Sequence, residues 1–194
     1  KTHVIMKEDN IVDVVKKYTQ EVLKEEDIVF ISEKAVAITQ GRAFPLDEIK
    51  PRPLARFLSR YVTKTKAGIG LGIPETMEMA LRECGVVKIL FAAVVGFLGK
   101  LIGRRGDFYR IAGYKASSID GPTPNTLPPY NRYVVLGPEN PDKIARQISE
   151  SVKAEVAIVD INDLGGNILG TSKETMDRKG LLGILKDNPL GQCS

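Results

Sequence analysis

Carboxylate and amide side chains that can bind a divalent cation directly follow one apolar segment of the chain. That segment, residues 156–159, predicts a buried strand because it is too short for an independent helix. The polar residues after it are Asp160, Asn162 and Asp163, and the glycines that come next are Gly165, Gly166 and Gly170. Oxygen ligands beside glycine backbone, which can approach a ligand closely, suit a divalent cation bound with phosphate oxygens. Asn, Asp and Gly are also ordinary turn residues, so a strand ending in a turn is the alternative interpretation.

A hydroxyl and two cations form a second group of candidates nearer the N-terminus. Residues 28–31 predict a buried strand, Ser32 and Lys34 follow it in a polar break, and a second apolar run at 35–38 precedes Arg42. This order can place Ser32 and Lys34 at the mouth of a pocket. A solvated turn between two elements is the alternative interpretation of the same residues.

The longest segment without a regular pattern is residues 114–132, which is rich in Pro, Ser, Thr and Asn. Loops of this length are usually functional or disordered. Asp120, Gly121 and Asn125 lie within it and are further candidates for oxygen ligands or substrate contacts.

The amino-acid composition argues against several kinds of binding site and catalytic site. The chain has 43% hydrophobic and 27% charged residues and a formal charge of +4, which is typical of a globular protein with a modest attraction for anionic ligands. The aromatic residues are scattered and not interleaved with arginine, so the footprint of a nucleic-acid binder is missing. Cys84 and Cys193 lie far apart, which argues against a zinc site or disulfide scaffold and favours a reducing, cytoplasmic location. His3 is the only histidine, which argues against histidine metal ligation and a Ser-His-Asp triad.

The pattern of apolar residues, caps and breakers predicts alternating helices and strands. Helices are expected at 11–26, 54–62, 75–84, 143–152 and 178–186, and strands at 28–31, 108–112, 133–136 and 156–159. The apolar run at 89–99 covers about half of the roughly 20 residues that a membrane-spanning helix needs, so we expect it to be buried core. Residues 1–10 are polar and mixed in charge and show no secretory signal pattern.

Three of these segments, in this order, resemble the coenzyme F-420:L-glutamate ligase (F-420-0:γ-glutamyl ligase) family. They are DIVFISEKAVAITQGR at 27–42, YVVLGPENPDKIAR at 133–146 and VAIVDINDLG at 156–165. The resemblance implies a mixed α/β (α+β) fold with mixed sheets and flanking helices, in a single ligase-like domain over 1–194. A subdomain boundary, if there is one, is expected near 45–75.

The same resemblance implies an enzyme that joins L-glutamate to a deazaflavin coenzyme precursor, or a related carboxylate acceptor, through a γ-linked amide bond. GTP is the implied cosubstrate, Mg²⁺ or Mn²⁺ the implied cofactor, and a homodimer the implied assembly, with no nucleic acid or membrane partner. The metal-binding residues would be Asp163, with Asp160 as the alternative, and Asp120. The nucleotide-contacting residues would be Ser32, Glu33 and Lys34, joined by Asn125, Gly165 and Gly166. Lys34 and Arg42 would neutralise developing charge in catalysis.

The chain also departs from that family's pattern. Ile38 stands where the family has a second lysine, Leu164 follows Asp163 where the family has threonine, and the compact loop expected around Asp120 is long and proline-rich. A diverged ligase is therefore one hypothesis, and a non-catalytic protein that binds a nucleotide or another anionic ligand on the same fold is the second. A third is an RNA- or membrane-surface protein that uses Arg104, Arg105 and the apolar run.

Overall fold

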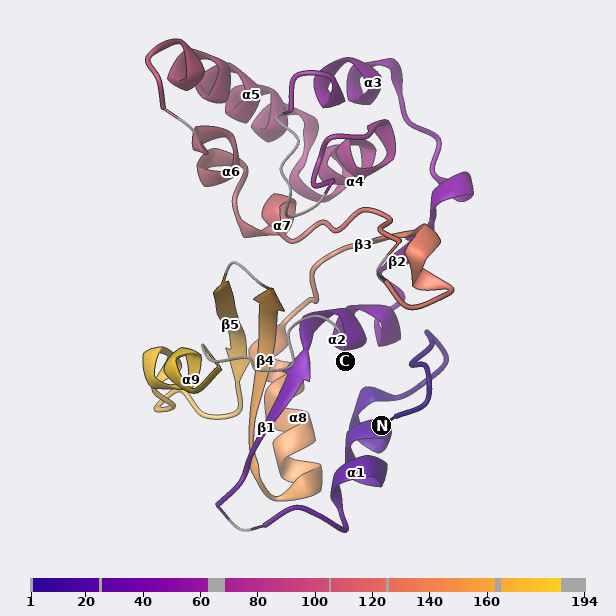
Figure 1. Cartoon of the computed structure of the whole chain (residues 1–194), viewed down its shortest axis with the longest axis vertical. Coiled ribbons are helices and arrows are strands. Elements are labelled where there is room, and N and C mark those ends of the chain that lie inside the picture. Colours follow the sequence, from indigo (N-terminus) through magenta and orange to yellow (C-terminus); the bar gives the residue numbers. More distant parts are fainter. Residues whose placement is uncertain are drawn as a thin grey trace. The chain divides into compact units, whose positions relative to one another are not determined.

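The computed structural model describes residues 2–24, 26–62, 69–104, 106–124, 126–162 and 165–185. The chain divides into two compact units. The first unit joins Lys1–Arg42 to Pro138–Ser194, and the second unit is Ala43–Gly137. In Figure 1 the first unit contains the elements labelled α1, β1, α2, α8, β4, β5 and α9. The second unit contains β2, β3 and the helices α3 to α7. This division does not test the prediction of a single ligase-like domain.

A three-stranded sheet forms the centre of the first unit within the described residues. Its order is β1 (Ile28–Ser32), β4 (Glu155–Asn162) and β5 (Gly165–Thr171). β1 runs parallel to β4, and their register extends from Ile28 opposite Glu155 to Ser32 opposite Val159. β4 and β5 are antiparallel neighbours (Figure 1). One parallel and one antiparallel pairing confirm the predicted mixed sheet and mixed α/β fold class.

Helices cover both faces of this sheet. They are α1 (Ile11–Thr19), α2 (Glu33–Thr39), α8 (Pro141–Val152) and α9 (Arg178–Leu185). Side chains alternate along β4, so Val156 and Ile158 pack with α1, α2 and α8, whereas Ala157 and Val159 pack with α9. All four of these β4 side chains are buried. Burial on both faces explains why this strand reads as a continuous apolar run in the sequence.

The second unit is mainly helical in its described part. β2 (Ala43–Pro45) pairs antiparallel with β3 (Tyr133–Val135). The helices are α3 (Pro53–Ser59), α4 (Pro74–Cys84), α5 (Val86–Leu101), α6 (Asp107–Ala112) and α7 (Tyr114–Ser117), with short 3-10 turns at Leu46–Glu48 and Tyr130–Arg132. One apolar cluster, centred on residues such as Leu71, Met77 and Ile89, forms the core of this unit.

Several predicted boundaries agree with the structure because local chemistry sets them. Asn10 caps α1 by accepting a hydrogen bond from the Val12 backbone N–H at 2.9 Å. Pro74 occupies the first turn of α4, and Gly85, with a φ of +86°, ends it. α1 itself ends at Thr19, so the prediction that this helix continues to residue 26 is wrong.

Three other local predictions are wrong. Residues 108–112, predicted as a strand, belong to α6. The predicted polar break after β1 is the start of α2, because Glu33 is its first helical residue. The predicted turn after Val159 begins later, because Asp160, Ile161 and Asn162 remain in β4 and pair with β5.

The apolar run at 89–99 is also not the buried core that the sequence predicted. It lies in α5, where Ile89, Ala92 and Gly99 are the buried residues, while large side chains such as Phe91 and Phe97 are exposed. Among the described residues, no single helix has the length and apolar character to cross a membrane. The consecutive helices α4 and α5 meet that test only as a pair, and they are bent by 118° where they join.

Candidate functional site

The candidate residues of the first unit gather at one edge of its sheet. Ser32, the last residue of β1, pairs with Val159 of the parallel strand β4, and β4 continues from there to Asn162; we call this the carboxyl edge. Glu33 and Asp160 each follow one of those residues in the chain. In open α/β sheets, ligands bind at this edge of the parallel strands.

The two carboxylates at this edge have different environments. Glu33 is buried, with 5% of its surface exposed, although it is the first residue of a helix. Asp160 is half-buried and, by the alternation of β4, lies on the same sheet face as Val156 and Ile158. Ser32 and Lys34 are exposed. This edge therefore combines two carboxylates of low or intermediate exposure with an accessible hydroxyl and an accessible ammonium group.

The segment after α2 is fixed to the loop that leads into α8. The Arg42 guanidinium donates to Glu139 Oε1 at 2.7 Å, and the Gln40 side-chain amide donates to the Glu139 carbonyl at 2.9 Å. The Glu139 backbone N–H donates in return to Gln40 Oε1 at 2.8 Å. These contacts join residues 27–42 to 133–146, the first two segments on which the family resemblance rests. Glu139 was not among the predicted site residues, and its acidic type within that second segment was the available signal.

A second set of contacts supports the hairpin that carries Asp160. Asp142 Oδ1, in the first turn of α8, accepts from the Thr171 backbone N–H at 2.9 Å and from Arg178 Nη2 at 2.7 Å. β5 and α9 are thereby held to the start of α8. Gly170 lies against the same turn, where a Cβ atom would overlap the main chain of Pro141 and Asp142.

The other residues that were predicted to bind the metal or the nucleotide lie in different parts of the chain. Asp120 lies in the second unit, half-buried, where its backbone exchanges two hydrogen bonds with Val135 at 2.9 and 3.0 Å. Asp163 and Asn125 lie outside the described residues. Gly165 and Gly166 begin β5 and pair with Asn162 and Ile161. The convergence of Asp120 with the acids after residue 159 on one cation thus stays a prediction.

Within the part of the chain that the structure describes, no three His, Cys, Asp or Glu side chains gather closely enough to hold a metal ion. A hollow of about 460 Å³ lies at the opposite edge of the sheet, where β1 and β4 begin. Asp27, Lys153, Glu155 and Lys173 are among its lining residues, and Lys173 pairs with Glu155 at 2.8 Å. Since these charges are mixed and partly paired, the hollow is a weaker candidate than the carboxyl edge.

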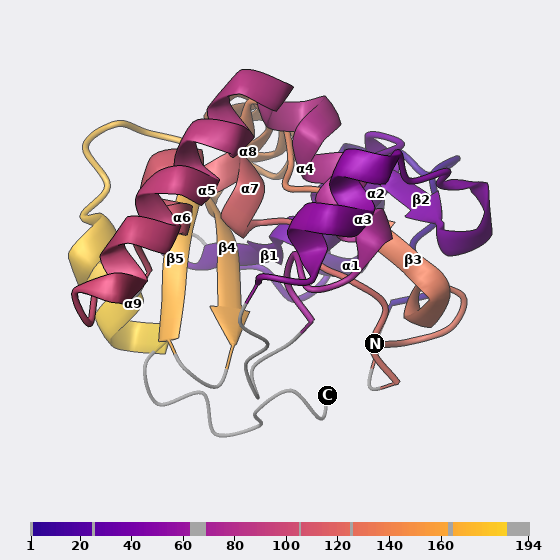
Figure 2. The same cartoon turned by 90° about the horizontal axis from the view of Figure 1, so that it is seen from above.

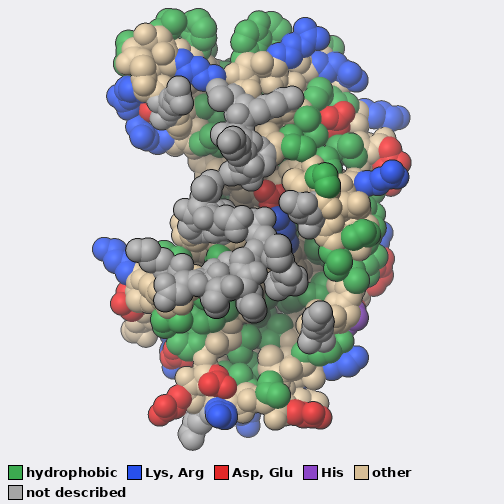
Figure 3. Space-filling model, viewed as in Figure 1, with side chains coloured by type: hydrophobic (Ala, Val, Ile, Leu, Met, Phe, Trp, Pro, Cys, Tyr) green, Lys and Arg blue, Asp and Glu red, His purple; other side chains and the backbone are tan. Residues whose placement is uncertain are grey.

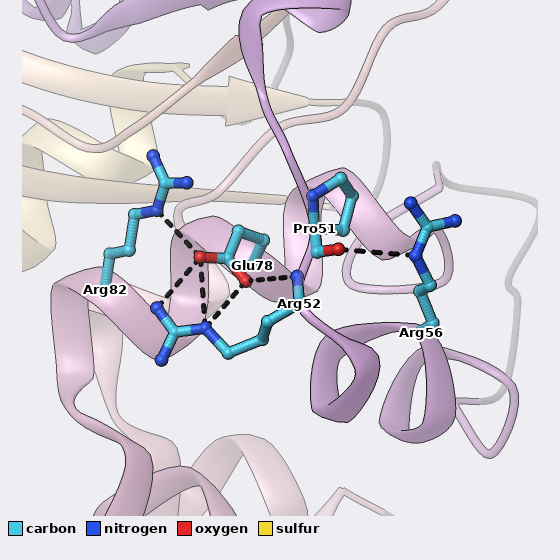
Figure 4. A network of polar contacts seen from close by, with 5 residues as sticks. All are labelled: Pro51, Arg52, Arg56, Glu78 and Arg82. Atoms are coloured by element: carbon cyan, nitrogen blue, oxygen red, sulfur yellow. Dashed lines mark hydrogen bonds and ion pairs between the residues drawn. The ribbon is translucent and has the colours of Figure 1, made fainter.

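The second unit contains a buried carboxylate that the sequence did not point to. Glu78 in α4 is 1% exposed and accepts from Arg52 Nε and Nη2, from the Arg52 backbone N–H and from Arg82 Nε, at 2.8 to 3.2 Å (Figure 4). Burial alone raises the pKa of this carboxyl, but the hydrogen bonds from Arg52 and Arg82 outweigh burial and hold the pKa below its ordinary value. This network joins the start of α3 to α4, which is a structural role.

Comparison with known proteins identifies the family. The family model described as F420-0:Gamma-glutamyl ligase matches residues 1–168. The chain belongs to the F420-0:gamma-glutamyl ligase family. The family expected from the three sequence segments is thus confirmed.

A curated relative agrees with this assignment. The protein named coenzyme F420:L-glutamate ligase from Methanopyrus kandleri is 26% identical over 163 residues, which cover 84% of this chain and 54% of the relative. The chain therefore spans about half the length of that ligase. The family match includes the carboxyl edge of the first unit and also Asp120, Asn125 and Asp163.

Proposed function

We propose that this chain carries the nucleotide- and metal-binding part of a GTP- and divalent-cation-dependent ligase that forms a γ-glutamyl amide bond. The acceptor would be a deazaflavin coenzyme precursor or a related carboxylate, and L-glutamate would supply the amine. The observation that carries the proposal is the family match over residues 1–168, together with the carboxylates and Lys34 at the carboxyl edge of β1 and β4. By the same resemblance, a cytoplasmic homodimer would be the working form.

The carboxylates at this edge are of the ligand type that a hard divalent cation prefers. Mg²⁺ and Mn²⁺ prefer carboxylate oxygens, and Asp160 is half-buried in β4, just beyond the point where β1 ends. In this proposal Asp163, three residues further along, and Asp120 would complete the set. A cation held there would neutralise charge on the phosphates of GTP.

The cationic residues have distinct roles in this proposal. Lys34 is exposed beside the carboxyl edge and would stabilise charge on the transferred phosphoryl group. Arg42, with 14% of its side chain exposed, already pairs with Glu139, so it would position the α2 segment.

The acceptor carboxylate would attack the γ-phosphorus of GTP, giving an acyl phosphate and GDP. The glutamate amine would then attack the acyl carbon, expel inorganic phosphate and lose a proton to form the amide.

A non-catalytic binding protein on the same fold is the second candidate, and one observation favours it. Ile38, at the position of the family's second lysine, is 7% exposed in α2. A cation that would help to neutralise GTP is replaced there by a core side chain. Turnover of GTP to GDP in the presence of L-glutamate and a carboxylate acceptor would reject this candidate.

Calorimetric titration of GTP with and without Mg²⁺ tests the proposed site. We expect Mg²⁺-dependent binding by the wild type and a loss of affinity of about tenfold to a hundredfold when the principal metal-binding aspartate becomes asparagine. Comparing Asp163→Asn with Asp160→Asn decides which of the two has that role. Asp13→Asn is the matched control, because Asp13 is an exposed aspartate of α1 in the same unit. If the wild type binds GTP equally well with Mg²⁺ and with a chelator, the metal-dependent proposal is wrong.

A further inference from the structure

The helix α5 is packed with its large apolar side chains pointing outward. The residues that it buries are Ile89, Ala92 and Gly99, two of which are small. The large hydrophobic residues that it exposes are Val87, Leu90, Phe91, Val94, Phe97, Leu98 and Leu101. Their spacing of three and four residues places them on one side of the helix, which we name the outer face. A contiguous apolar face of this size marks an interaction surface.

Close packing against α6 fixes which side of α5 points outward. A Cβ atom at Gly96 would lie 2.9 Å from Phe108 Cβ, and one at Gly99 would overlap the Asp107 carboxylate. The glycines of α5 therefore must face α6, which lies beside it in both cartoon views (Figures 1 and 2). The two helices can approach closely only with the large residues on the opposite side.

Exposed lysines lie near both ends of α5, whereas Arg104 beyond its C-terminal end is ion-paired with Asp107 at 3.2 Å. Residues 85–106 contain the basic residues Lys88, Lys100, Arg104 and Arg105 and no Asp or Glu, and residues 49–74 contain no acidic residue either. Lys100 Nζ donates to the Tyr61 carbonyl at 3.1 Å, so the residues that directly follow α3 lie beside the end of α5. There Phe57 and Tyr61 are exposed and in ring contact, with centroids 5.1 Å apart. Figure 3 shows hydrophobic and basic side chains next to each other in this part of the molecule.

We propose that the outer face of α5 binds the surface of a membrane that contains acidic lipids. An apolar helix face bordered by lysine and arginine, with exposed Phe and Tyr at its edge, matches the acyl–headgroup boundary of an anionic bilayer. The helix has 16 residues and is thus about 24 Å long, shorter than the roughly 30 Å hydrocarbon layer. It would lie in the membrane interface and not cross it.

Charge complementarity favours an anionic bilayer over a second copy of this chain. Two outer faces packed together would bring Lys88 and Lys100 of both copies into proximity, and α5 carries no acidic residue to pair with them. Asp107, just beyond α5, is buried and already paired with Arg104 and Arg110. Lipid headgroups such as phosphatidylserine supply the missing negative charge, and each basic residue near such a surface strengthens binding.

Vesicle flotation of the whole chain tests this proposal. We expect the wild type to float with vesicles of phosphatidylcholine containing phosphatidylserine, and to float much less with phosphatidylcholine alone or at high salt. Val94→Glu places a carboxylate in the centre of the outer face and should lower the bound fraction about tenfold. Lys88→Gln should weaken binding to the acidic vesicles only.

The control variant is Val22→Glu, which makes the same substitution at an exposed valine of the first unit and should float like the wild type. Circular dichroism checks that each variant is folded. Absence of wild-type flotation, or equal flotation of Val94→Glu, would overturn the proposal. So would a dimer, seen by sedimentation velocity, that Val94→Glu dissociates while acidic vesicles bind nothing, because the outer face would then be a contact between two copies.

Discussion

Gly170→Ala is expected to lower the free energy of unfolding of the first unit by about 3 kcal/mol, the upper part of the range for overpacking a closed site. Gly170 is buried in β5, opposite Ile158. The added methyl group would overlap the main chain of Pro141 and Asp142, and a backbone cannot rotate away as a flexible side chain can. Moving that turn would also lengthen the hydrogen bonds that Asp142 accepts from Thr171 and Arg178.

Urea unfolding followed by circular dichroism measures this effect, and Gly183→Ala is the matched control. Gly183 lies inside α9 of the same unit, and a Cβ atom there would meet no heavy atom within 4 Å. Alanine in a helix interior is better than glycine by roughly 0.5–1 kcal/mol, so the control should be slightly more stable than the wild type. Equal stability of the two variants would show that β5 and α8 are not packed as the structure has them.

Elements with a strong local signal could be predicted from the sequence. The Asn10 cap and the Pro74 start with its Gly85 stop each fix a helix end through a backbone hydrogen bond or a restricted φ, whereas α8 begins at Pro141, two residues before the predicted start. β1 and β4 were predictable because apolar runs of four residues between polar breaks suit buried strands. In these segments the conformation that the local sequence favours is also the one that packs in the folded unit.

The orientation of α5 and the identity of α6 depended on tertiary contacts. Residues 108–112 are too few to show a helical period, and α6 is fixed by Asp107, which is buried beneath ion pairs with Arg104 and Arg110. In α5 the apolar content predicted burial, but the positions of Gly96 and Gly99 decide which side packs. Glycine spacing was the signal that could have identified the buried side.

The candidate site was predictable only within one unit. The apolar runs at 28–31 and 156–159 follow from the sequence, and their parallel pairing brings Glu33 and Asp160 to one edge, although β4 continues past Val159 to Asn162. Asp120 belongs to the other unit and is separated from Asp160 in the chain by the whole of β3 and α8. Spacing along a sequence cannot place residues across such a division, because each unit folds around a hydrophobic core of its own.

Glu78→Gln is expected to lower the free energy of unfolding of the second unit by about 2–3 kcal/mol. The substitution keeps the size of the side chain, so it leaves no cavity, but it removes the charge that Arg52 and Arg82 share. Hydrogen bonds to charged groups contribute about 1.5–3 kcal/mol to stability. The side-chain NH₂ group of Gln would also place its own N–H donors against the N–H donors of the arginines. Glu75→Gln, at the half-buried glutamate one turn earlier in α4, is the control and should change stability by no more than about 0.5 kcal/mol.

The stability difference between the wild type and Glu78→Gln is expected to shrink in acid. Because the pKa of Glu78 is lower in the folded chain than its ordinary value of 4.5, the folded state binds this proton less readily than the unfolded state does. The contribution of the carboxylate is therefore complete above the unfolded pKa and is lost as the pH falls through the folded pKa. Urea midpoints of both proteins measured from neutral pH down through this range check the expectation. A difference that stays constant throughout would contradict the expectation, because the contribution of Glu78 would then not depend on the ionisation of its carboxyl group.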